Sequence, residues 1–88
     1  MYEVLLSHEA EKDYVKQDSE TRRRIDKAIE ALSVGPLKGP HIKKLTGKLK
    51  GRFRFALGGL RIVYKVENEK IVVVIIAIRS RGDVYKKG

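Results

Sequence analysis

The sequence predicts an α+β fold in which a helical hairpin packs on one face of a mostly antiparallel four-stranded sheet, in the order β-α-α-β-β-β. Three patterns support this class: a helical apolar period before Pro36, a two-residue alternation over residues 52–66, and an unbroken apolar run at Ile71–Ile78. Because 88 residues can enclose only one hydrophobic core, we expect residues 1–88 to form a single domain.

The N-terminal segment predicts a short strand followed by a short helix. Residues 2–6 are mostly apolar and predict the first strand. Ser7 can cap a helix that ends near Gln17, and Glu9 and Glu11 in the first turn suit the positive end of the helix dipole.

The second helix has a clearer pattern and begins at Ser19, a good N-cap. Its apolar residues fall on one helical face: Ile25, Ala28, Ile29 and Leu32. Gly35 and Pro36 end it. The short link to the first helix favours an antiparallel helical pair. We expect residues 33–51, which hold both prolines, to be a connection inside the domain.

Two strands then form a hairpin around the turn Gly58-Gly59. Pairing Leu57 with Leu60 sets the register, with Arg54 opposite Val63. One face then carries the basic side chains Arg52, Arg54, Arg61 and Lys65, with Arg52 opposite Lys65. The other carries Phe53, Phe55, Leu60, Ile62, Tyr64 and Val66. We expect the apolar face to receive the helices.

The stretch Ile71–Ile78 predicts a central strand, because it is apolar at both odd and even positions. Residues 2–6 are its natural second neighbour. Arg79 follows this strand directly. Whether Arg79 shares a face with Arg61 depends on the register after the turn at residues 67–70, which the sequence leaves open.

The charge of the chain is distributed unevenly. Its net value is +9, yet residues 1–30 hold eight acidic and six basic residues, and residues 31–88 hold three acidic and 14 basic ones. Residues 31–66 contain no acidic residue at all. A charge needed only for solubility does not require such exclusion. The asymmetry therefore indicates a polyanionic partner, most often a nucleic acid.

Several kinds of site are excluded or disfavoured by composition. There is no cysteine, which excludes disulfides and thiolate metal sites and is natural for a cytoplasmic protein. The longest apolar run has eight residues, too few to cross a membrane. The basic region holds no carboxylate cluster for Mg²⁺, and His8 and His41 lie in different regions of the chain. We therefore expect no metal, no other cofactor and no membrane partner.

The residues suited to chemistry are basic and lie on the exposed sheet face or just after the last strand. The candidate catalytic set is Arg52, Arg54, Arg61, Arg79 and Tyr85. Guanidinium forks match phosphate oxygens, and a tyrosine ring can stack on a nucleobase. Further candidates for RNA binding are Lys44, Lys48, Lys50, Lys65 and Arg81. The run Arg22–Arg24 is interpreted as a solvated helix face, with ribosomal RNA contact as the lesser alternative.

The motifs of the chain also follow a recognisable order. After the first strand and the two helices come Lys43-Lys44-Leu45-Thr46-Gly47, Arg52-Phe53-Arg54, Gly59-Leu60-Arg61-Ile62-Val63-Tyr64, Arg79 and Val84-Tyr85. Over nearly the whole chain this order and spacing resemble the RelE branch of the RelE/ParE toxin superfamily. The resemblance implies the toxin of a type II toxin–antitoxin pair, with a RelB-like antitoxin as partner, that cleaves mRNA in the A site of the ribosome.

Residue matching within this resemblance places Arg61, Arg79 and Tyr85 at functional positions of the family. Arg52 and Arg54 lie where some members have lysine. Arginine cannot readily accept a proton, so the general base stays open, with Tyr85, Lys48 and Lys50 as candidates.

The chemistry that suits these residues is attack of a ribose 2′-hydroxyl on its own 3′-phosphate. Negative charge gathers on the phosphoryl oxygens in the transition state, where preorganised arginines stabilise it without a metal ion. Two alternatives stay open. One is a ParE-like inhibitor of DNA gyrase that has the same fold and no nuclease activity. The other is a non-catalytic RNA-binding protein.

Overall fold

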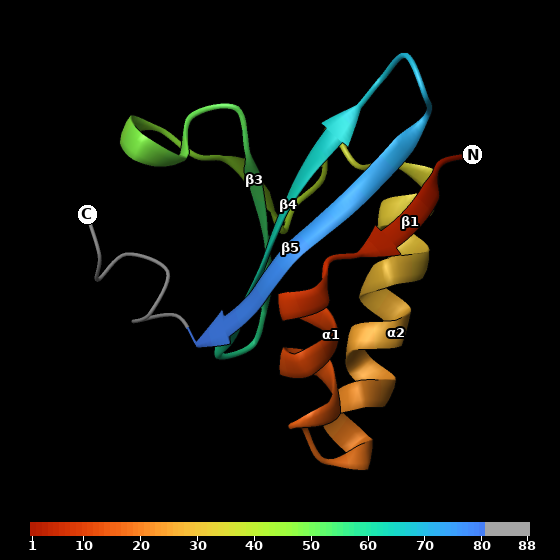
Figure 1. Ribbon diagram of the computed structural model, residues 1–88, viewed down its shortest axis with the longest axis vertical. Helices are drawn as coiled ribbons and strands as arrows, with labels where there is room; N and C mark the ends of the chain where they lie inside the picture. The colour runs from red at the N-terminus through yellow and green to blue at the C-terminus, as the bar shows by residue number, and fades with distance from the viewer. Residues whose placement is uncertain (81–88) are drawn as a thin grey trace.

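Two helices cover one face of a twisted five-stranded sheet (Figure 1). The computed structural model describes residues 1–80. The elements follow in the order β1 (Glu3–Leu6), α1 (His8–Val15), α2 (Ser19–Val34), β2 (Ile42–Lys44), the 3₁₀ helix η1 (Gly47–Leu49), β3 (Phe53–Leu57), β4 (Leu60–Glu67) and β5 (Val72–Ser80). The strand order in the sheet is β1-β5-β4-β3-β2. Only the β1–β5 pair is parallel among the described strands.

The α+β class and the helical hairpin on one sheet face are confirmed, with one correction to the sheet. It has five strands rather than four, because β2 lies within the stretch expected to be a connection. This strand pairs antiparallel with β3, with Ile42 opposite Phe55 and Lys44 opposite Phe53. Three residues are too few to show a two-residue period, so only backbone pairing reveals the strand.

Polar side chains cap both helices. Ser7 caps α1 as predicted, since its Oγ accepts a hydrogen bond from the Ala10 N–H at 3.1 Å. The N-cap of α2 is Asp18 rather than Ser19, and its Oδ1 accepts the Thr21 N–H at 2.8 Å. Asp18 has extended backbone angles and Ser19 is already helical, so only Asp18 is placed to cap.

The arginine run on α2 is only partly a solvated face. Arg23 and Arg24 are exposed as predicted. Arg22 is half-buried, and its Nη1 donates to the Gln17 carbonyl at 2.8 Å. Arg22 therefore ties α2 to the link that follows α1.

The main core lies between the helices and the sheet. Its buried members are Ala10, Ile25, Ala28, Leu32, Phe55, Ile62, Tyr64, Val73, Ile75 and Ile78. Tyr64 is fully buried, and its hydroxyl donates to the Pro36 carbonyl at 2.7 Å. Burial raises the pKa of the Tyr64 hydroxyl. The ring of Phe53 stacks on Tyr64 with centroids 5.5 Å apart.

The hairpin of β3 and β4 has the predicted register, with Leu57 opposite Leu60 and Arg54 opposite Val63. Its turn requires a glycine at position 58, where φ is +58°. The predicted pairing of Arg52 with Lys65 is wrong, because β3 begins only at Phe53.

Candidate nucleic-acid interface on the open sheet face

The sheet face away from the helices, here called the open face, carries a group of arginines. Arg54 and Arg61 come from β3 and β4, where Arg61 pairs with Ala56 and Arg54 with Val63. Residues opposite each other in a sheet share a face, and those two positions along are diagonal neighbours. Arg54 and Arg61 are therefore neighbours, as the alternation predicted.

A β-bulge brings Arg79 to the same face. The register between β4 and β5 shifts between Val63 and Tyr64, so that Tyr64 pairs with Ile75 and Arg61 pairs with Arg79. Without the extra residue on β5, Arg79 would lie opposite Leu60, on the face that packs against the helices. The question left open by the sequence is thus answered: Arg61 and Arg79 are cross-strand neighbours.

Backbone carbonyls hold two of these guanidinium groups. The Nη1 of Arg61 donates to the carbonyls of Gly58 and Leu60, each at 2.9 Å. The Nη1 of Arg54 donates to the carbonyl of His41 at 2.8 Å. The Nε atoms of Arg54 and Arg61 are buried and have no hydrogen-bond partner within residues 1–80. An anionic oxygen is the acceptor that suits guanidinium nitrogens best.

Arg79 reaches from its strand to carboxylates on α1. It forms ion pairs with Glu9 through Nη2 and with Asp13, whose Oδ2 lies 3.1 Å from the Arg79 Nε. The Nε–H is not aimed closely enough at this oxygen to form a hydrogen bond. More than a third of the Arg79 side chain, 37%, stays exposed, so the group remains accessible from solvent.

The open face is not uniformly basic. Val63 lies on it and is buried against Leu45 and Leu49, which come from the β2–β3 connection. Lys65 also lies there, but its Nζ is 3.3 Å from the carboxylate of Glu67. The carboxylate of Glu67 therefore partly neutralises the charge of Lys65, which weakens Lys65 as a candidate for RNA binding.

The two lysines of β2 divide between the two faces of the sheet. Lys44, a candidate from the sequence, pairs with Phe53 and so lies on the opposite face from Arg54. Lys43, which the sequence reasoning did not select, pairs with Arg54 and shares its face. Only the register of β2 could distinguish the two, and this strand was not expected.

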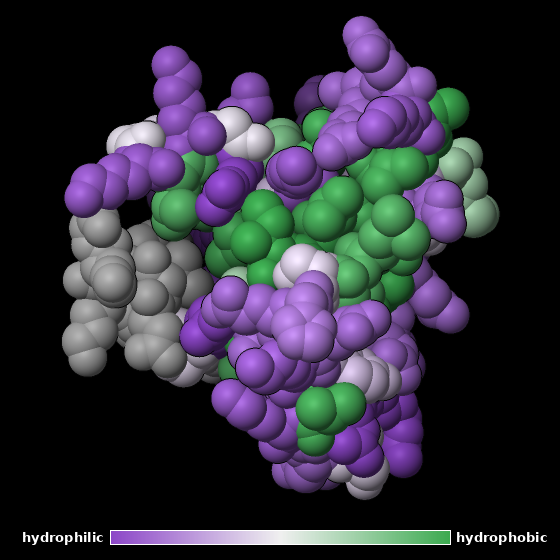
Figure 2. All heavy atoms as spheres, in the orientation of Figure 1, coloured by the Kyte–Doolittle hydropathy of each residue, from purple (hydrophilic) through white to green (hydrophobic). Residues whose placement is uncertain are grey.

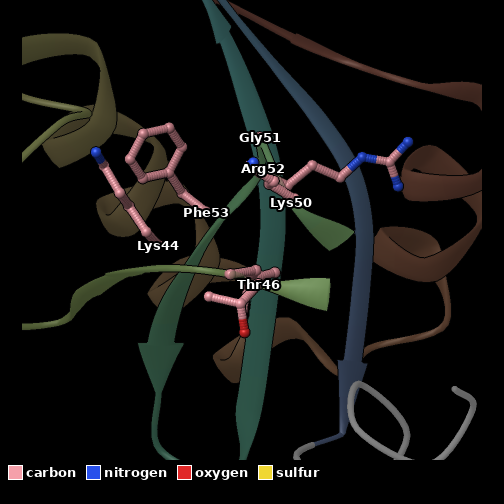
Figure 3. Close-up of a pocket in the computed structure, with 7 residues that line it drawn as sticks. Lys44, Thr46, Lys50, Gly51, Arg52 and Phe53 are labelled. Atoms are coloured by element: carbon pink, nitrogen blue, oxygen red, sulfur yellow. The ribbon is translucent and has the colours of Figure 1, made fainter. Parts of the chain in front are cut away.

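A pocket of about 630 Å³ opens beside the start of β3 (Figure 3). It is lined by Lys44, Leu45, Thr46, Lys50, Gly51, Arg52 and Phe53. Figure 3 shows Lys44 and Phe53 extending to one side of the strand and Arg52 to the other. Arg52 thus borders the open face from the loop before β3 instead of belonging to a strand, Lys50 follows η1, and Lys48 is exposed on η1.

Two predicted residues, Arg81 and Tyr85, lie outside the described residues. Within residues 1–80 no three potential metal ligands from His, Cys, Asp and Glu come together. His41 is exposed and its ring contacts Phe55, at a centroid distance of 5.4 Å. No helix in the described part of the chain is long and apolar enough to span a membrane.

Comparison with known proteins identifies the family of this chain. The family described as the ParE toxin of the type II toxin–antitoxin system parDE matches residues 4–85. The chain belongs to the RelE/ParE toxin superfamily. A putative RelE-like toxin protein of Escherichia coli is 30% identical in an alignment 95 positions long, which covers 96% of this chain and 90% of that protein. The resemblance predicted from the sequence motifs is therefore confirmed, and the chain is a toxin of the type II class.

Solved structures of RelE-type toxins have the same fold. In the RelBE2 toxin–antitoxin complex of Mycobacterium tuberculosis the similar chain has a TM-score of 0.82 and 27% identity, covering 91% of this toxin and 98% of that chain. The isolated RelE toxin of Escherichia coli has a TM-score of 0.78 and 27% identity, covering 99% of this toxin and 94% of that chain. The similar chain of the archaeal RelE–RelB complex of Pyrococcus horikoshii has a TM-score of 0.77 and 25% identity, covering 92% of this toxin and 96% of that chain.

Proposed function

We propose that this toxin is a ribosome-dependent endoribonuclease that cleaves mRNA in the A site. The observation that carries the proposal is the row of Arg54, Arg61 and Arg79 on the open face, each with a buried Nε that has no hydrogen-bond partner within residues 1–80. Guanidinium groups held by backbone carbonyls or carboxylates are preorganised, so they need little rearrangement when a phosphate arrives.

The reaction uses the substrate's own nucleophile. The ribose 2′-oxygen forms a bond to the adjacent phosphorus while the bond from phosphorus to the 5′-oxygen breaks. The 2′-proton passes to a base and the 5′-oxygen takes up a proton, which leaves a 2′,3′-cyclic phosphate and a 5′-hydroxyl. Arg61 and Arg79 hold the phosphoryl oxygens, and Arg52 and Arg54 support the developing charge. The general base stays open among Tyr85, Lys48 and Lys50, and Tyr85 is also suited to stack on a base.

The ribosome supplies the orientation that this small surface lacks. An exposed sheet face does not enclose the substrate, so it cannot by itself align the 2′-hydroxyl in line with the leaving 5′-oxygen. The remaining cations proposed to contact RNA are Lys48, Lys50, Lys65 and Arg81, and Lys43 takes the place of Lys44 because Lys43 lies beside Arg54 and Lys44 lies on the other face.

A RelB-like antitoxin is the proposed protein partner in the cytoplasm. Apolar residues gather over β1 and β5 in the view of Figure 2, bordered by hydrophilic ones. Leu5 of β1 is 45% exposed and lies opposite Val74 of β5. Exposed apolar patches of this kind mark protein contacts, and the basic residues nearby suit an acidic partner. Two of the similar structures named above are toxin–antitoxin complexes.

Primer extension on an mRNA bound to programmed ribosomes tests the proposed activity. We expect the toxin to produce a new 3′ end inside the A-site codon, and a message that stays intact on such ribosomes refutes the proposal. The matched family is described as a ParE toxin, which keeps inhibition of DNA gyrase as the second candidate. A supercoiling assay decides between the two, because only a gyrase inhibitor blocks supercoiling while leaving the message intact.

A further inference from the structure

The two carboxylates of α1 that contact Arg79 differ in their surroundings. Asp13 is only 6% exposed, and within residues 1–80 it is the single buried charged side chain. Its Oδ2 accepts the N–H of Ile78 at 2.9 Å and also lies 3.1 Å from the Arg79 Nε. Glu9, one helical turn earlier, contacts the Arg79 Nη2 with a side chain that is 62% exposed. Asp13 therefore faces the inner edge of the guanidinium and Glu9 its outer edge.

These surroundings predict different strengths for the two contacts. A buried carboxylate without a nearby cation is costly, so Asp13 keeps Arg79 as its counter-charge. An exposed ion pair such as that of Glu9 with Arg79 contributes little to stability. A phosphate group accepts two parallel hydrogen bonds from a guanidinium and competes well against a single exposed carboxylate.

The space around Arg79 can receive such a phosphate. A polar cavity of about 270 Å³ is lined by His8, Glu9, Lys12, Asp13, Lys16 and Arg79. Three permanent cations outnumber the two carboxylates, and the excess grows when the exposed Glu9 side chain swings away. An anion entering this cavity thus meets a net positive charge.

We propose that Asp13 positions Arg79 for phosphate binding and that Glu9 occupies the phosphate-binding edge of Arg79 until RNA displaces it. The inference rests on the RNA-directed function proposed above. It makes Asp13 a positioning residue, acting only through Arg79, and it makes Glu9 an internal competitor of the substrate.

The test compares three substitutions that each remove one negative charge from α1: Glu9→Gln, Asp13→Asn and, as the matched control, Glu11→Gln. Glu9 and Glu11 both lie in the first turn, so both lose the same favourable helix-dipole contact. The measurement is binding of a fluorescent single-stranded RNA oligonucleotide to the purified toxin. A general electrostatic effect tightens binding equally in all three variants.

The proposal predicts opposite signs for the two carboxylates. Relative to the Glu11→Gln control, Glu9→Gln binds RNA about two- to fivefold more tightly, the size of one exposed ion pair. Asp13→Asn binds about tenfold more weakly, the size of one charge-assisted hydrogen bond to phosphate. Equal affinities of Glu9→Gln and Glu11→Gln, or an Asp13→Asn variant that binds as well as the control, overturn the proposal.

Two further measurements separate positioning from a merely structural role. In the Arg79→Ala background, Asp13→Asn should have no further effect on RNA binding, whereas a loss of folding would weaken binding there too. In the free toxin, the ¹⁵N–¹H signal of the Arg79 Nε, assigned by its loss in Arg79→Lys, should move in Asp13→Asn and stay in place in Glu11→Gln. The asparagine retains an oxygen that can accept the Ile78 N–H, which favours a folded variant.

The outcome is separable from that of the proposed function. If the parent toxin cleaves mRNA on ribosomes but the three variants bind RNA alike, the role of Asp13 and Glu9 is refuted and the nuclease function stands. If the parent does not cleave, but the binding changes have the predicted opposite signs, the nuclease function is refuted and the control of Arg79 stands.

Discussion

Replacing Arg61 with alanine removes the central guanidinium of the open face. Arg61 lies between Arg79, its partner on β5, and Arg54, its diagonal neighbour on β3. Its Nη1 donates to the carbonyls of Gly58 and Leu60. Its Nε is buried and has no hydrogen-bond partner within residues 1–80. A donor fixed in this way contributes most when negative charge develops on the phosphate.

The expected loss is large in rate and small in stability. Removing one preorganised donor from a developing oxyanion costs about 2.7–4 kcal/mol, or about 10²–10³ in the cleavage rate. The two carbonyls are exposed or partly buried and can bond to water instead, so the free energy of unfolding should fall by only about 1 kcal/mol.

The assay is single-turnover cleavage of an mRNA on programmed ribosomes, followed by primer extension. Arg23→Ala is the matched control, because Arg23 is exposed on α2 and its loss changes the net charge by the same amount. Arg61→Lys keeps the charge without the fork and should recover only part of the rate. If Arg61→Ala cleaves as fast as Arg23→Ala while both remain folded, the placement of the site on the open face is refuted.

Four further outcomes are expected. RNA binding should weaken with salt, with a slope in log K against log salt of about −0.7 for each phosphate neutralised on a single strand, and an affinity independent of salt would exclude the basic surface as the binding surface. A single 2′-deoxy nucleotide at the cleavage site should block the reaction on ribosomes, since it removes the nucleophile, and normal cleavage of that message would refute the mechanism. Tyr64→Phe leaves the carbonyl of Pro36 without its 2.7 Å donor and should lower the free energy of unfolding by about 1–3 kcal/mol, measured by urea denaturation. The hydrogen bond from the Thr21 N–H lowers the pKa of Asp18. The stabilisation that this cap gives to the folded protein is therefore complete above the ordinary carboxyl pKa and is lost as the pH falls through the lowered value. In thermal melts, Asp18→Ala should be less stable than the parent near neutral pH and should converge with it in acid.

The sequence by itself determined the class of the fold and the faces of its central hairpin. The two-residue alternation on both sides of Gly58-Gly59 sets the register of β3 and β4, because the turn is short and the pairing is local. The same pattern correctly placed Arg54 and Arg61 on one face, away from the core. The 3.6-residue period of α2 likewise identified Ile25, Ala28 and Leu32, all of which are buried.

Only the tertiary structure decided how Arg79 joins this group. The bulge that brings Arg79 opposite Arg61 lies in a strand that is apolar at every position up to Ile78, so no alternation could reveal the extra residue. The contact of Asp13 with the backbone of Ile78 joins groups 65 residues apart. The sequence of α1 does not show that Asp13 is buried, because a single carboxylate in a helix of mostly polar residues is usually exposed. The three-residue β2, which separates Lys43 from Lys44, is likewise visible only through its hydrogen bonds to β3. In each case the deciding interaction is a pairing between distant segments, and local periodicity contains no information about such pairings.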